Sequence, residues 1–297
     1  MTVAGFVVAL LVAAYLVAII EAWATTGRFQ PVAPLYSGIA LLGRETIVPR
    51  RPDRLLYETA PALLLIATVL AAAVLPLAPS AILTDLATGA LFVNAALAYV
   101  MVALVMAGWG PNGAYAMVAG WRFLGQTVAY SMLIVMPVVG VGMRAESLST
   151  VDVVQSQAPL WNALYQPLGF VVFVFAATAL AFLPPFDLPT APGELAGGVT
   201  GEYTGARLAV FRLARLILVA TLATSISTFY LGGWHGPLLP DWVWTSGKSL
   251  AVMAAMFIAG RNLPRMREEH LLTWSWKLGI PLALLNIAVV GVMLIVV

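Results

Sequence analysis

The sequence predicts an all-α polytopic membrane protein. Of its 297 residues, 62% are hydrophobic and only 9% are charged, whereas a soluble domain carries about 45–50% apolar and about 25% charged residues. The apolar residues form continuous runs as long as a membrane-crossing helix, about 20 residues, and do not alternate with the period of two that barrel strands show. These observations exclude a soluble enzyme, a disordered chain and a coiled coil.

Eight stretches are long and apolar enough to span the bilayer as helices. In chain order they are 2–23, 57–78, 85–107, 115–142, 161–183, 208–231, 242–260 and 271–297. The fourth is expected to be tilted or kinked, because Pro137 removes a backbone donor inside it. No internal repeat or second domain is visible, so residues 1–297 are interpreted as a single transmembrane domain.

Basic residues concentrate in alternate connections, and this distribution predicts the orientation. The basic connections are 24–56, 108–114, 184–207 and 261–277, whereas the clear loop positions on the other side hold Arg144 alone. Because Lys/Arg-rich short loops stay in the cytoplasm, these four segments are predicted to be cytoplasmic loops and both termini to lie outside. A cleavable signal peptide is not expected, because the first span lacks a basic start and ends in Glu21.

The composition also limits the chemistry that this chain can perform. It has no cysteine, and its two histidines, His235 and His270, lie too far apart in sequence to indicate a metal cluster. Its net charge of +2 comes without a Lys/Arg run able to neutralise phosphates, so no nucleic-acid partner is expected. Any redox centre should therefore belong to a partner subunit or be a diffusible molecule.

Four ionisable residues at membrane depth are candidate functional groups. Arg212 and Arg215 are spaced i and i+3 and so share one helix face. Burying an arginine costs about 2.5–3.5 kcal/mol on insertion scales, so a partner carboxylate or a hydrated cavity is expected; the alternative is snorkelling toward the cytoplasmic boundary. Glu21 and Arg122 either line a hydrated path or anchor helix ends.

Near the predicted outer boundary, the polar residues are expected to be interfacial. Lys248 follows Trp242 and Trp244 and is interpreted as an interfacial anchor. Trp234 and His235 are similarly interpreted as part of an aromatic belt.

The cytoplasmic segment 184–194 holds four prolines, which predict a shaped, semi-rigid turn. A carboxylate held in such a turn can acquire an elevated pKa suited to proton relay. Asp187 is therefore either a relay group or the cap of a short helix that begins near Thr190.

Motifs along nearly the whole chain resemble one membrane protein family. In order they are Arg44-Glu45, Asp53-Arg54, Ala60-Pro61, Gly108-Trp109, Tyr115-Ala116, Gln126 to Tyr130, Gln166 to Phe170, Pro185 to Pro189, Glu194-Leu195, Glu202-Tyr203, Gly232 to Pro237, Arg261 to Arg267 and Trp276 to Leu284. Together they resemble the NuoH-type subunit, the membrane subunit 1 family of respiratory complex I and of related energy-converting hydrogenases.

The resemblance implies a non-catalytic subunit of a membrane oxidoreductase in the bacterial cytoplasmic (inner) membrane. It implies an iron–sulfur peripheral arm and antiporter-like membrane subunits as partners, part of a quinone chamber at the subunit interface, and coupling of electron transfer to proton or ion translocation. This chain would bind no metal itself; iron–sulfur clusters, and nickel–iron in the hydrogenases, would sit on the partners.

The expected site residues form two groups once the ionisable residues of the spans are added. The proton-relay or coupling group is Glu21, Asp187, Glu194, Glu202, Arg122, Arg212 and Arg215. The group on the quinone side or at the docking face is Glu45, Asp53, Arg54, Arg261, Arg265 and Arg267.

The chain also departs from the family pattern where that pattern has acids. The positions concerned are Ser131, Leu180, Thr190, Pro192 and Arg215. The connection over 27–37 is shorter than usual as well. A neutral residue passes no proton unless water bridges the gap, so a quinone-independent anchor of a group 4 nickel–iron hydrogenase-type complex is the alternative function. The sequence leaves open the electron donor and acceptor, and the choice between protons and sodium.

Two further classes are remote alternatives. A stand-alone secondary transporter would predict a midplane site with broken helices, often in two repeated halves, whereas the ionisable residues here crowd one membrane face. An intramembrane enzyme would need clustered aspartates or a His-Glu-x-x-His motif, and the sequence has neither.

Overall fold

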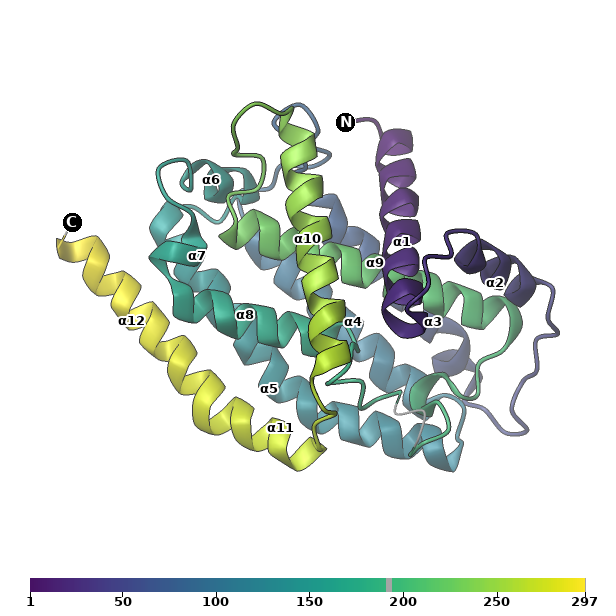
Figure 1. Cartoon of the computed structure of the whole chain (residues 1–297). Helices are drawn as coiled ribbons and strands as arrows, with labels where there is room; N and C mark the ends of the chain where they lie inside the picture. Colours follow the sequence, from purple (N-terminus) through teal and green to yellow (C-terminus); the bar gives the residue numbers. More distant parts are fainter. Residues whose placement is uncertain (191–193, 297) are drawn as a thin grey trace.

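The computed structural model describes residues 1–190 and 194–296, and in these ranges the chain forms helices and no strands (Figure 1). The elements in order are α1 (Val3–Thr26), α2 (Ala33–Leu42), α3 (Arg54–Ala73), α4 (Gly89–Trp109), α5 (Ala114–Ala145), α6 (Thr150–Gln155), α7 (Asn162–Tyr165), α8 (Pro167–Leu180), η1 (Gly198–Thr200), α9 (Gly205–Tyr230), α10 (Asp241–Asn262), α11 (Glu268–Trp274), the π-helical η2 (Ser275–Gly279) and α12 (Ile280–Val296). The predicted all-α class is confirmed.

Seven helical stretches in the described part are long and apolar enough to cross a membrane. They are α1, α3, α4, α5, α9, α10 and the run Glu268–Val296, each within a few residues of a predicted span. The remaining predicted span, 161–183, holds α7 and α8. The 14 residues of α8 extend about 21 Å at 1.5 Å per residue, less than the hydrocarbon core of about 30 Å. The count of eight spans and the outside termini stay predictions.

Capping residues set the ends of two of the spans. The Thr2 hydroxyl accepts the Gly5 N–H of α1 at 3.2 Å, and α1 ends at Gly27 with φ +70°. The Asp53 carboxylate accepts the N–H groups of Leu55 and Leu56 at 3.1 and 3.3 Å. Asp53, predicted as a docking residue, is thus the N-cap of α3 in the structure, and such a cap contributes about 1 kcal/mol to helix stability.

The connection 24–56, which was predicted as a cytoplasmic loop, contains the helix α2. Pro34 stands in its first turn, where the missing N–H needs no partner. Apolar side chains cover its exposed face, with Tyr36 76% and Ile39 69% exposed. The Tyr15 hydroxyl of α1 donates to the Pro31 carbonyl at 2.8 Å, which ties α2 to the first span. A short helix with this apolar face is typical of the membrane interface.

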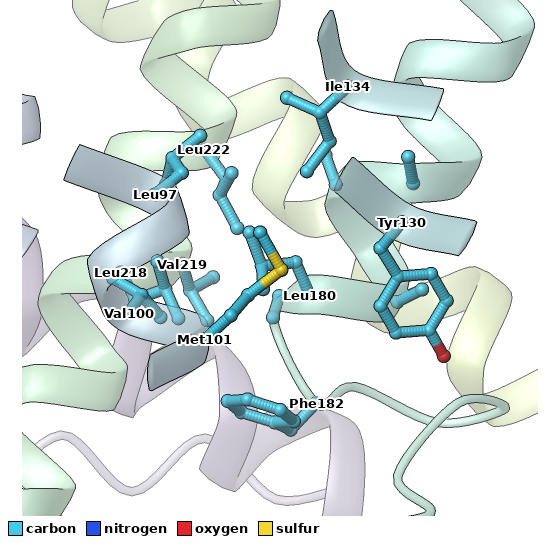
Figure 2. Close-up of a cluster of buried hydrophobic side chains, with 14 of the residues drawn as sticks. Leu97, Val100, Met101, Tyr130, Ile134, Leu180, Phe182, Leu218, Val219 and Leu222 are labelled. Atoms are coloured by element: carbon cyan, nitrogen blue, oxygen red, sulfur yellow. The ribbon is translucent and has the colours of Figure 1, made fainter. Parts of the chain in front are cut away.

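The apolar core lies where α4, α5, α8 and α9 meet. Figure 2 shows side chains from these helices converging, namely Leu97, Val100 and Met101 of α4, Tyr130 and Ile134 of α5, Leu180 of α8, Leu218, Val219 and Leu222 of α9, and Phe182. Leu180, which replaces a family acid, is fully buried in this cluster. The side chain at this position therefore offers no polar group to a relay.

We name the two ends of the molecule after the predicted orientation. The cytoplasmic end contains α2, the 184–204 segment and the connection from α10 to α11; the outer end contains α6 and the 231–240 turn (Figure 1). At the outer end, Lys248 is 9% exposed and Trp234 is 5% exposed. Interpreting these two residues as an interfacial anchor and a belt residue was wrong, because both side chains pack inside the protein.

Candidate functional site: a charged chamber at the cytoplasmic end

A cavity of about 1030 Å³ opens at the cytoplasmic end between α1, α2, α9, α10 and the segments on either side of 191–193. This volume lies at the upper end of the range for small-molecule pockets, about 300–1,000 Å³. Its apolar walls come from small side chains of α1 and from larger ones of α2, α9 and α10, including Ala18, Ala22, Leu41, Leu213, Leu216 and Phe257. We call this cavity the chamber.

Five charged residues line the chamber, and two of them form an ion pair. Arg215 Nη1 lies 3.0 Å from Glu21 Oε1, with side chains that are 27% and 31% exposed. The second guanidinium nitrogen of Arg215 lies 3.5 Å from the Phe182 carbonyl oxygen. Glu21 is therefore the partner carboxylate of Arg215, and both side chains line the chamber.

The other lining charges leave an excess of positive charge. Asp187 Oδ2 pairs with Arg265 Nη2 at 3.0 Å, so both chamber carboxylates, Glu21 and Asp187, are engaged. Arg212 and Arg261 also line the chamber, and each lacks an ion-pair partner among the described residues. Both side chains are exposed to the open space. The chamber thus presents two uncompensated guanidinium groups, which makes it an anion-attracting site.

Asp187 is held by a compact turn, as the prolines predicted. The Phe186 N–H donates to the Leu183 carbonyl at 2.8 Å, and the Thr190 N–H donates to the Asp187 carbonyl at 3.3 Å. The Asp187 side chain is only 10% exposed, whereas that of Arg265 is 56% exposed. Residues up to Thr190 form a turn and no helix starts at Thr190 itself. The replaced position Pro192 lies outside the described residues.

The connection from α10 to α11 packs directly on this turn. The Met266 N–H donates to the Pro185 carbonyl at 3.1 Å. Any Cβ at Gly260 would overlap the Pro184 carbonyl oxygen, so this close contact of α10 requires glycine. The motif Arg261 to Arg267 and the motif Pro185 to Pro189 are therefore neighbours in space.

A stacked tyrosine pair stands beside the chamber and joins α3 to the start of α9. The rings of Tyr57 and Tyr203 stack with centroids 4.6 Å apart and an interplanar angle of 12°. Arg207 contacts both carboxylate oxygens of Glu58, at 3.0 and 2.6 Å, with its guanidinium 5.3 Å from the Tyr57 ring centroid. Burial raises the pKa of Tyr203, so its phenol stays protonated.

Sequence reasoning missed this cluster, although Arg207 lies in the basic connection 184–207 and Glu58 at the start of the predicted span 57–78. The one available signal was an acid and a base placed near the cytoplasmic ends of two spans. The Glu202 backbone carbonyl accepts the Tyr57 hydroxyl at 3.2 Å, while the Glu202 side chain is exposed. Glu202 is adjacent to the cluster and does not line the chamber.

The other predicted site residues lie apart from the chamber. Arg122 of α5 contacts Glu194 at 3.2 Å and Glu268 of α11 at 3.3 Å, forming a separate ion-pair cluster. The side chains of Glu45, Arg54 and Arg267 are exposed on the cytoplasmic end. The structure therefore brings together Glu21, Asp187, Arg212, Arg215, Arg261 and Arg265, and leaves the rest in separate places.

The chamber has the composition of a site for an amphiphilic molecule. Within the described residues, no three His, Asp or Glu side chains come together as metal ligands. The small apolar residues of α1 instead form a smooth wall next to charged groups. This combination fits a ligand that has an apolar chain and a polar head group.

Comparison with known proteins gives two matches over nearly the whole chain. The sequence profile of the NADH dehydrogenase family matches residues 5–291. A NuoH-type subunit of the NADH-quinone oxidoreductase of Geobacter metallireducens is 38% identical over 306 aligned residues, which cover 96% of this chain and 93% of that protein.

Proposed function

Since the chain belongs to the NADH dehydrogenase family, as a NuoH-type membrane subunit of an NADH-quinone oxidoreductase-type complex, we propose that it docks the iron–sulfur peripheral arm and couples quinone reduction to ion translocation. The observation that carries the proposal is the chamber, which joins apolar walls to a charged cytoplasmic end. The arm would dock on the cytoplasmic loops, where exposed charges surround the chamber. This subunit would hold no redox centre of its own.

Within this proposal, the chain's own residues position a quinone and transmit charge. Ala18, Ala22 and Leu41 would contact the prenyl chain, and the quinone ring would accept electrons from a cluster on a partner subunit. The pairs Glu21–Arg215 and Asp187–Arg265 would respond to a change of charge at the interface, because each guanidinium can exchange its carboxylate for another acceptor.

A second function, the quinone-independent anchor of a hydrogenase-type complex, is favoured by two structural findings. Leu180 is fully buried in an apolar cluster, and Arg215 holds Glu21 in an ion pair. Two positions of the family's acidic series are thereby removed from a standard relay. If the chain couples electron transfer to protons or sodium, it does so by a route that avoids Leu180.

The proposed partners follow from family membership. They are the iron–sulfur and catalytic subunits of a peripheral arm on the cytoplasmic side, and antiporter-like subunits within a bacterial inner membrane. The lipid-exposed side chains of α12, such as Leu285 and Val292, 50% and 61% exposed, offer an apolar surface for a membrane-arm neighbour or for lipid.

Affinity purification of the tagged chain in mild detergent tests this proposal, with mass spectrometry and metal analysis of the co-purifying proteins. Iron–sulfur subunits with a quinone-reducing dehydrogenase module and no nickel are expected. Nickel in the preparation would select the hydrogenase function instead. If the chain purified alone or as copies of itself, the redox-subunit proposal would be overturned in favour of a stand-alone transporter.

A further inference from the structure

We propose that the chamber binds an anionic phospholipid, with the lipid phosphate contacted by Arg212 and Arg261. Both guanidinium groups line the cavity, and neither has an ion-pair partner among the residues that the structure describes. Unpaired cations beside a cavity with apolar walls attract an anion, and a guanidinium binds phosphate through two parallel hydrogen bonds. The inference does not rest on quinone binding or on which redox complex contains the chain.

The depth of the two arginines agrees with the level of lipid phosphates. The 26 residues of α9 extend about 39 Å, so its ends project beyond a hydrocarbon core of about 30 Å. Arg212 lies seven residues from the first residue of α9, which is about 10 Å along the helix. Arg261 is the penultimate residue of α10. Both side chains can therefore reach the boundary between hydrocarbon and headgroups.

The surrounding helices provide a place for the acyl chains. The helix α2 carries its apolar residues Tyr36 and Ile39 on the exposed side, as a helix embedded in the membrane interface does. The same helix lines the chamber through Ala33, Pro34 and Leu41, opposite small residues of α1. An acyl chain along Ala33 and Pro34 of α2 would continue the membrane interior into the chamber, and the wall formed by Ala18, Ala22 and Leu41 would remain for the quinone chain.

The charge balance favours an anionic headgroup over a zwitterionic one. A choline or ethanolamine headgroup brings an ammonium that needs an anion or an aromatic face near the phosphate. The chamber's lining includes aromatic rings, among them Phe182, Tyr203 and Phe257, but its two carboxylates are already engaged, Glu21 by Arg215 and Asp187 by Arg265. A lipid whose only headgroup charge is its phosphate, such as phosphatidylglycerol, matches two free guanidinium groups.

The test compares lipid retention by the purified complex carrying the intact chain, exchanged into detergent with equal phosphatidylglycerol and phosphatidylcholine and examined by native mass spectrometry. Retention of phosphatidylglycerol at one copy per chain is expected for the unaltered protein. The variant R212Q/R261Q should weaken this retention by at least about tenfold, as expected for loss of a charge-assisted contact. The control R50Q/R51Q removes the same charge from exposed cytoplasmic positions outside the chamber and should retain the lipid.

Each other outcome overturns the proposal in an identifiable way. Equal retention of the two lipids by the unaltered complex would do so without any variant, so misfolding of R212Q/R261Q leaves the test intact. Displacement of the lipid by millimolar inorganic phosphate would identify a free-phosphate site. Retention by the isolated chain but not by the complex would show that a partner's carboxylates cover the arginines. None of these outcomes bears on whether iron–sulfur subunits co-purify.

Discussion

Lys248 and Arg212 are cations in neighbouring membrane-spanning helices, and the structure accommodates them in opposite ways. Lys248 Nζ donates to the carbonyl oxygens of Leu231, Gly233 and His235 at 2.7, 2.9 and 2.8 Å, and it lies 4.6 Å from the Trp161 ring centroid. By contrast, Arg212 faces the chamber with an exposed side chain.

The difference separates a structural cation from one that is available to bind. All three ammonium donors of Lys248 are used, so no ligand can add to it without displacing the backbone. The carbonyls converge because Gly232 and Gly233 adopt φ values of +72° and +46° against Trp161 and Val154, a conformation that glycine adopts at no steric cost. A charged residue at membrane depth thus indicates a binding site only where its hydrogen-bonding capacity is left open.

The largest expected effect is at Lys248, whose three ammonium donors are all used. Replacing Lys248 with Met leaves three buried carbonyls without a donor, and we expect a loss of about 3–5 kcal/mol of stability. The midpoint of thermal unfolding in detergent measures this effect. Trp242→Phe, at the exposed start of α10, is the control and should unfold as the unaltered protein does. An unchanged midpoint for Lys248→Met would remove the contrast with Arg212.

The next largest effect is expected at the ion pair Asp187–Arg265, in which the carboxylate is nearly buried and the guanidinium is exposed. Arg265→Ala leaves a nearly buried carboxylate unpaired, and we expect a loss of about 1–2 kcal/mol with reduced assembly or turnover of the complex. Asp187→Asn removes that charge and should cost less stability while still impairing turnover. Subunit stoichiometry and quinone-reductase activity are the measurements. Full activity in an intact complex carrying either change would exclude that residue from the site.

A smaller effect is expected at the pair Glu21–Arg215, where water reaches both side chains. Glu21→Gln and Arg215→Gln should each destabilise the complex, and the double variant should cost less than their sum by about 1 kcal/mol. A double-mutant cycle of unfolding midpoints measures this coupling. Additive effects would mean that the contact between Glu21 and Arg215 contributes nothing to stability. Arg215 would then be as available to bind a ligand as Arg212.

The smallest effect is expected at the contact between Arg122 and Glu194, because the Glu194 side chain is 72% exposed. Exposed ion pairs contribute about 0.2–1 kcal/mol, so Glu194→Gln, which leaves the Arg122–Glu268 pair in place, should change stability by no more than about 0.5 kcal/mol. The same unfolding assay measures it. A loss as large as that of Lys248→Met would show that the Glu194 contact is structural.

The sequence carried enough information to predict seven helices that are long and apolar enough to cross a membrane, because apolar length alone decides whether a helix can cross the bilayer. It did not reveal α2, since ten residues between proline and glycine fall below the length of any span. Asp53 was predicted as a docking residue of the connection 24–56, whereas in the structure its carboxylate caps α3. In the sequence, an aspartate that caps a helix looks the same as one that docks a partner. Only the hydrogen bonds in the structure distinguish the two roles.

The site was predictable in its residue types and not in its pairings. The arginines of α9 called for a carboxylate, but a helix face does not show that Glu21, almost 200 positions earlier, supplies it. The environment of Lys248 was harder still to predict, because its acceptors are backbone carbonyls. Every residue has such a carbonyl, so no sequence pattern records which ones meet the ammonium.

The anchoring of Lys248 has a mechanical consequence for the opposite end of α10. Sliding α10 along its axis would break three hydrogen bonds at once, whereas tilting it about Lys248 leaves them in place. Arg261 lies 13 residues further along the same helix, about 20 Å from this pivot. A tilt of about 3° would therefore displace Arg261 by about 1 Å. The Lys248 contact at the outer end therefore fixes the point about which α10 can tilt. A tilt about this point would change the width of the chamber at the cytoplasmic end.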